Sequence, residues 1–176
     1  TNKLSETGDP TETGRLSEEE KAQFARHVLM PSPAEVFVAM NRMGETDWTG
    51  VASFNPRYDY GSDVARALNL GVRAADGFLA IQAKDKAKLG DMIVIILTLA
   101  EELMVERAIL DKGRMFDELS REGKWEQLHG ELNGLRDDML YEIKRLGEDD
   151  IALLVSAGGW LEGMRAMASI LSDEYD

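Results

Sequence analysis

Apolar and polar residues follow a helical spacing along most of the chain. From residue 17 onward apolar side chains recur at steps of three and four, and no segment shows the two-residue alternation of a half-buried strand. Ser17 with Glu20 and Ser32 with Glu35 form two capping boxes, which predict the starts of the first two helices. The pattern predicts further helices over 62–83, 85–110, 115–121, 125–146 and 148–171. The predicted fold class is therefore all-α, a single-domain helical bundle of about five to seven helices.

The most apolar stretch is 92–100, in which only Thr98 carries a polar group. A helix that is apolar on every side has to be surrounded by protein, so this run predicts a buried central helix. It is far shorter than the ~20 residues that span a bilayer, and it is flanked by Asp91 and Glu101. The helices at 62–83, 125–146 and 148–171 are expected to enclose it, and no membrane span is predicted.

The last predicted helix carries two faces that predict contacts. A stripe of small residues predicts a close approach of another backbone, with Gly71 of the 62–83 helix as the partner. The stripe consists of Ala152, Ser156, Gly159, Gly163 and Ala166. A neighbouring apolar face consists of Leu153, Ala157, Trp160, Met164, Met167 and Leu171. The helix is therefore expected to be buried on two sides.

The first 16 residues are polar with few apolar side chains, which predicts a disordered N-terminal tail ahead of a domain over 17–176. The chain starts at Thr1 with no initiator methionine. Such a start is typical of a protein whose signal peptide has been removed, although a trimmed chain looks the same. The expected location is exported or periplasmic, with a cytoplasmic location left open.

The net charge and the composition exclude several classes of partner and of site. A formal charge of −13 repels phosphate backbones and anionic membranes, so nucleic acid is excluded as an expected partner while basic proteins remain open. The absence of cysteine excludes disulfides, thiolate metal sites and a cysteine nucleophile.

An irregular stretch over 45–61 gathers four of the chain's aromatic residues, which are Trp48, Phe54, Tyr58 and Tyr60. One interpretation is a hydrophobic lid that seals one end of the bundle. The other is an aromatic binding surface, because tyrosine and tryptophan combine apolar area with a polar tip.

A second candidate site is a polar stripe on the 62–83 helix. It consists of Arg66, Asn69, Arg73 and Asp76 at steps of 3, 4 and 3, and Arg165 and Glu162 of the last helix are possible neighbours. As a binding site, the guanidinium groups would hold a carboxylate or a phosphate. As a solvated face, Arg73 and Asp76 would simply form an i,i+3 ion pair.

Catalytic motifs are sparse. Glu126 and His129 match the Glu-x-x-His element of carboxylate-bridged metal bundles, but no second copy exists. The sequence shows neither the setting of a serine nucleophile nor a phosphate-binding glycine loop. It therefore predicts no catalytic residues, no metal site and no cofactor.

Three segments show a resemblance to known proteins. They are Ala-Leu-Asn-Leu-Gly-Val-Arg-Ala-Ala-Asp-Gly-Phe-Leu-Ala-Ile-Gln-Ala at 67–83, Leu-Val-Ser-Ala-Gly-Gly-Trp-Leu at 154–161, and Pro-Ala-Glu-Val-Phe-Val-Ala at 33–39. They resemble uncharacterised exported all-helical bacterial proteins with no assigned activity. The resemblance implies export and a helical fold, and it brings no site residues.

These patterns leave three functional hypotheses. The first is a non-enzymatic exported domain that binds a protein or small ligand through Trp48, Phe54, Tyr58, Tyr60, Arg73, Asp76 and Arg165. The second is a metal-dependent or carboxylate-based enzyme that uses Glu126, His129 and glutamates of the central helix. The third is a structural homo-oligomeric subunit that associates through the 125–146 helix.

Overall fold

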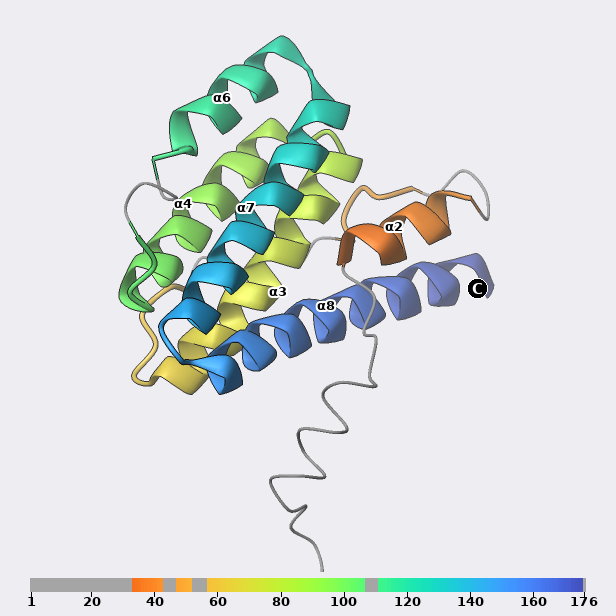
Figure 1. Cartoon of the computed structure of the whole chain (residues 1–176). Helices are drawn as coiled ribbons and strands as arrows, with labels where there is room; N and C mark the ends of the chain where they lie inside the picture. The colour runs from red at the N-terminus through yellow and green to blue at the C-terminus, as the bar shows by residue number, and fades with distance from the viewer. Residues whose placement is uncertain (1–32, 43–46, 52–56, 107–110, 176) are drawn as a thin grey trace, which may run out of the picture. The chain divides into compact units, whose positions relative to one another are not determined.

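The computed structural model describes residues 33–42, 47–51, 57–106 and 111–175, all within the compact unit 31–176. These residues form six α-helices and no strand, as the sequence predicts (Figure 1). The helices are α2 (Pro33–Asn41), α3 (Asp63–Gln82), α4 (Lys86–Glu102), α6 (Gly113–Glu122), α7 (Trp125–Arg145) and α8 (Asp149–Tyr175). The tail predicted at 1–16 and the helix start predicted at Ser17 lie outside the described residues.

Local chemistry sets most helix ends where the sequence predicts them. The side chains of Ser62 and Asp85 accept hydrogen bonds from the third amide of α3 and of α4. Gly123 and Gly147 follow α6 and α7 with φ of 70° and 85°, a conformation that costs glycine little. The capping side chains therefore predict the starts of α3 and α4 nearly to the residue, and the glycines predict the ends of α6 and α7.

Helix α4 ends earlier than the sequence predicts. It stops at Glu102, whereas the apolar spacing extends it to about residue 110. Met104 takes a left-handed φ of 64°, although no glycine or proline announces the change. Leu103 and Val105 are nevertheless buried, so the apolar pattern continues past the end of the helix into a non-helical segment. Periodicity alone therefore overextends this helix.

The buried central helix of the bundle is α3. It packs against α2, α4, α7 and α8, and it is buried almost continuously from Leu70 to Ile81. The run at 92–100, expected to fill this role, lies in α4 and is not covered on every side. Ile96 and Leu99 are fully buried there, but Val94 is 65% exposed. The expectation of enclosure on every side is wrong because α4 packs mainly against α3 and α6 and leaves its third side to solvent.

Helices α3 and α8 make the closest backbone contact in the described part. A Cβ atom placed on Gly71 would lie 1.9 Å from the carbonyl oxygen of Val155, and one placed on Gly158 would lie 2.0 Å from that of Leu68. The predicted pairing of α8 with Gly71 is therefore confirmed. Gly158, which admits the backbone of α3, lies beside the predicted small-residue stripe, while the amide nitrogen of Gly159, within the stripe, would lie 2.7 Å from a Cβ atom on Gly71.

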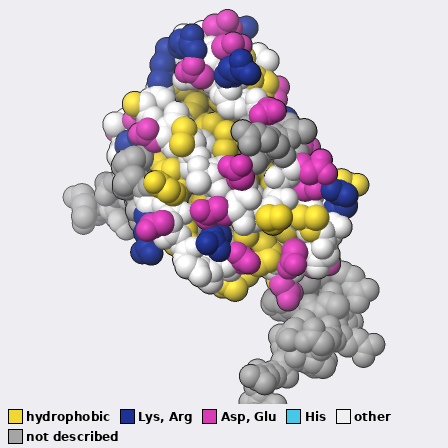
Figure 2. Space-filling view, turned by 90° about the vertical axis from the view of Figure 1, so that its left-hand side faces the viewer, with side chains coloured by type: hydrophobic (Ala, Val, Ile, Leu, Met, Phe, Trp, Pro, Cys, Tyr) yellow, Lys and Arg dark blue, Asp and Glu magenta, His cyan; other side chains and the backbone are white. Residues whose placement is uncertain are grey.

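Helix α7 presents one narrow apolar seam to the bundle, as its spacing predicts. The middle of the seam is fully or almost fully buried and consists of Leu128, Leu132, Leu135, Met139 and Ile143. At its predicted ends Trp125 is half-buried and Leu146 is 46% exposed. None of the described helices has the length and apolar character needed to cross a membrane. On the face shown in Figure 2, acidic and basic side chains are interspersed around apolar ones.

Candidate functional site

The aromatic residues of the 45–61 stretch do not share one exposed surface. Trp48 is only 7% exposed, packs edge-on against Phe37, and donates its indole N–H to Asn41. Tyr58 is exposed, whereas Tyr60 is half-buried and donates its hydroxyl to the carbonyl of Arg57. Phe54 lies outside the described residues. Trp48 therefore has the position expected of a lid residue.

The polar stripe of α3 divides into a surface part and a buried part. Arg66 pairs with Glu102 and Asp63 near the surface, and Asn69 donates to the backbone carbonyl of Ala65. Arg73 and Asp76 are instead almost completely buried, with 2.7 Å between Nη1 and Oδ2. Asn69, Arg73 and Asp76 lie on one side of α3, but only Arg73 and Asp76 are buried.

Helix α8 adds a second pair to this buried part. Glu162 is buried and accepts a 2.7 Å hydrogen bond from Nε of Arg165. Arg165 also donates, through Nη2, to the carbonyl of Val51 at 2.6 Å. Arg73, Asp76, Glu162 and Arg165, hereafter the charge cluster, therefore connect α3 and α8 to the 47–51 segment. Three predicted site residues, Arg73, Asp76 and Arg165, are thus brought together.

The charge cluster holds an unusual proton. Burial, and then the negative charge of Glu162, raise the pKa of Asp76 to about 8, although Arg73 and Arg165 oppose the shift. Asp76 is accordingly protonated at neutral pH, beside the carboxylate of Glu162. The hydrogen bond from Arg165 to Glu162 raises the pKa of Arg165 in turn. The pKa values of Asp76 and Arg165 thus both depend on Glu162.

Two atoms of the charge cluster remain without hydrogen-bond partners, namely Nε of Arg73 and Oδ1 of Asp76. Both are buried polar atoms, for which a missing partner costs stability. Neither residue lines the groove between α2 and α7 that is described next. The cluster can store a proton and join two helices.

A groove of about 700 Å³ lies instead between α2 and α7. Its lining is largely polar and charged and consists of Glu35, Val38, Ala39, Arg42, His129, Gly130, Asn133, Arg136 and Asp137. The imidazole of His129 packs against the ring of Phe78 with 5.0 Å between centroids. Burial lowers the pKa of His129, so the ring is neutral at pH 7.

The metal hypothesis receives no geometric support from the described residues. No group of three or more histidine, aspartate or glutamate side chains is arranged there to hold an ion. Glu126 is exposed, whereas His129 faces the groove. A Glu-x-x-His pair without further carboxylates supplies at most two ligands.

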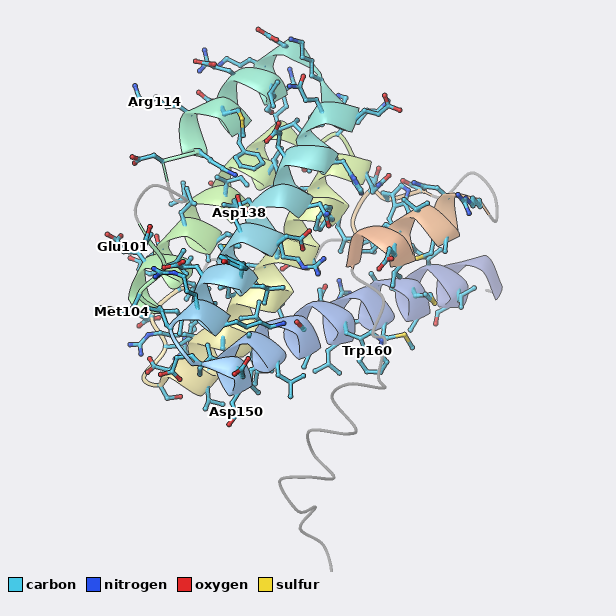
Figure 3. All side chains as sticks on the ribbon, in the orientation of Figure 1. Glu101, Met104, Arg114, Asp138, Asp150 and Trp160 are labelled. Atoms are coloured by element: carbon cyan, nitrogen blue, oxygen red, sulfur yellow. The ribbon has the colours of Figure 1, made fainter. Side chains whose placement is uncertain are left out.

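One apolar surface of α8 has no cover among the described residues. The outward face of α8 consists of Leu153, Ala157, Trp160, Leu161, Met164, Ala168 and Leu171. Leu161 is 55% exposed and Leu153 is 47% exposed, while Trp160 is half-buried and projects from the side away from α3 (Figure 3). The expectation that α8 is buried on two sides is therefore wrong for the described part. Helices α2, α3 and α7 all pack on the opposite side of α8.

Sequence reasoning found the charge cluster but missed the groove. Its lining comes from two helices about 100 residues apart, and nothing in either segment alone indicates that they meet. The one local signal is Gly130, a glycine inside a regular helix with no packing neighbour near its missing Cβ.

Comparison with known proteins adds no constraint, because no family model, curated protein or solved structure matches this chain.

Proposed function

We propose that this chain is a non-enzymatic docking domain that binds an amphipathic helix of a partner protein along the outward face of α8. The observation that carries the proposal is the row of exposed large apolar side chains along one side of α8, where Leu153, Leu161, Met164 and Leu171 are each more than 40% exposed. Large exposed apolar patches on soluble domains are typical of interaction sites. The row covers about five turns, or about 27 Å at the helical rise per residue.

The spacing of this face fits a helix as its occupant. Five steps of 4, 3, 4, 4 and 3 connect Leu153, Ala157, Trp160, Met164, Ala168 and Leu171. Steps of three and four residues keep these side chains on one side of the helix, which is how a helix presents an apolar seam to a second helix. Trp160, near the middle, supplies the kind of large aromatic side chain that dominates binding energy at interfaces.

The negative charge of this chain favours a basic helix as the partner. The outward face begins after Glu148, Asp149 and Asp150, and the sequence places Asp173 and Glu174 at its far end. Two copies of α8 would bring acidic ends together in a parallel or an antiparallel pair. A partner helix with an apolar seam and lysine or arginine at its ends would instead be attracted by this chain of charge −13.

The test uses a fluorescein-labelled peptide of leucine and lysine patterned as an amphipathic helix. We expect the full chain to bind it and Leu161→Glu to weaken binding at least about tenfold, or about 1.4 kcal/mol. Leu161→Glu adds negative charge, so purely electrostatic attraction of the peptide would be strengthened rather than lost. Fluorescence anisotropy gives the dissociation constants.

The matched control is Val94→Glu, which adds the same charge at an exposed apolar position on α4. It should bind the peptide as the wild-type chain does. Equal binding by Leu161→Glu would overturn the proposal. A wild-type dimer in sedimentation that Leu161→Glu dissociates would also overturn it, in favour of the homo-oligomeric hypothesis.

Export remains part of the proposal through the resemblance of 33–39, 67–83 and 154–161 to exported helical proteins. The docking face does not depend on it.

A further inference from the structure

We propose that the groove between α2 and α7 binds a small molecule through an oxyanion, either a carboxylate or a phosphate group. This site is separate from the outward face of α8, and its test does not depend on the docking proposal. Its volume of about 700 Å³ lies within the range of small-molecule pockets. Four features of its lining support an anionic ligand.

The first feature is a guanidinium group without a partner. The side chain of Arg42 lines the groove and makes no hydrogen bond or ion pair with any residue that the structure describes. In a chain with 33 acidic and 20 basic residues, carboxylates to pair with it are abundant. An unpaired arginine beside a groove is therefore available for an external anion.

The second feature is the weak pairing of Arg136. Its Nη1 lies 3.5 Å from Oδ1 of Asn133, and its Nη2 lies 3.5 Å from Oδ1 of Asp137. Both distances are at the outer limit of useful hydrogen bonding. The two carboxylates of the groove, Glu35 and Asp137, already interact with other groups. Arg136 can therefore reorient toward a ligand oxyanion and give up only two weak contacts.

The third feature is His129. Its Nε2 is covered by protein and has no hydrogen-bond partner, while its ring is held against Phe78. Nε2 is therefore closed to a ligand in the groove, but the residue itself lines the groove. An oxyanion bound beside the ring would favour the protonated imidazole, and the added positive charge would strengthen binding.

The fourth feature is Gly130, next to His129 in the groove wall. Glycine inside a helix is less favourable than alanine, and close helix packing is the usual compensation. At Gly130 an added Cβ would meet nothing within 4 Å, so no such packing exists. The absence of a side chain there leaves the groove open beside the imidazole.

The test follows the imidazole signals of His129 by NMR while acetate or inorganic phosphate is added, with chloride at matched ionic strength as the reference. We expect a saturable shift with acetate, phosphate or both, and none with chloride. A response to acetate alone assigns the ligand group as a carboxylate, and a response to phosphate alone assigns it as a phosphate.

Two variants then test the site itself. Arg42→Gln removes the unpaired charge, and Gly130→Leu fills the groove at a position with room for a side chain. Each should weaken binding of the anion at least tenfold. Arg114→Gln removes an exposed arginine of α6 and should leave the affinity unchanged (Figure 3). The proposal is overturned if neither anion shifts His129 saturably, or if both groove variants bind as the wild-type chain does.

Discussion

Replacing Gly71 with alanine is expected to destabilise the domain by about 3 kcal/mol or more, at the upper end of what overpacking costs. The new methyl group would lie 1.9 Å from the carbonyl oxygen of Val155, a backbone atom that cannot rotate away. Relief requires α3 and α8 to move apart along their whole contact, which also opens the charge cluster. Urea unfolding followed by circular dichroism measures the loss.

The chain offers matched comparisons for this substitution. Gly158→Ala meets the carbonyl of Leu68 at 2.0 Å and should be as damaging. Gly134→Ala has the same chemistry within α7 but no neighbour within 4 Å, and it should stabilise the domain by up to about 1 kcal/mol. If Gly71→Ala unfolded at the same urea concentration as Gly134→Ala, the described contact between α3 and α8 would be wrong.

Raising the pH from about 6.5 to about 8.5 is expected to lower the free energy of unfolding by about 2 kcal/mol through Asp76. The folded chain keeps a proton on Asp76 up to about pH 8, whereas the unfolded chain releases it near the ordinary value of 3.8. Between these two values the folded state binds more protons, so stability falls as the pH rises. Urea unfolding at a series of pH values gives the slope.

The window starts near pH 6.5 because His129 acts in the opposite direction below it. Burial lowers the pKa of His129 in the folded chain, so the unfolded chain takes up that proton first as the pH falls. The contribution of His129 is therefore lost below its ordinary pKa of 6.5, while above that value both states are largely neutral at this residue. Starting the measurement there separates the two groups.

Asp76→Asn tests the assignment, because asparagine has nearly the same shape and no proton to release. The variant should lose this pH dependence and be more stable than the wild-type chain at about pH 8.5. Should asparagine disturb the fold, Glu162→Gln gives a second test. It removes the negative charge that helps raise the pKa of Asp76, so the fall in stability should move to lower pH. An unchanged slope in both variants would show that another group carries it.

The sequence predicted the features that depend on local chemistry. Ser62, Asp85, Gly123 and Gly147 set helix ends by capping or by a positive φ, and each is visible in a short window. Gly71 indicated the contact with α8 because a glycine inside a helix needs a compensating close approach. Arg73, Asp76 and Arg165 were grouped correctly because their helices were paired correctly.

What the sequence could not predict depends on which surfaces remain uncovered. The sequence does not distinguish a buried apolar residue, such as Ile96, from an exposed one, such as Val94 or Leu161. Burial of α4 on every side and of α8 on two sides was therefore overestimated. The groove at His129 needs α2 and α7 placed in space, and helical spacing carries no such information.

The interlock of α3 and α8 also bears on how the chain is made. Gly71 and Gly158 are separated by α4, α6 and α7 in the sequence. Helix α3 can therefore pack against α8 only after α4, α6 and α7 have been synthesised. Contacts between such distant segments are slow to form and leave apolar surface uncovered meanwhile. A ribosome-bound chain that ends before α8 should therefore be a client of chaperones, and release from them should coincide with the emergence of the last described helix.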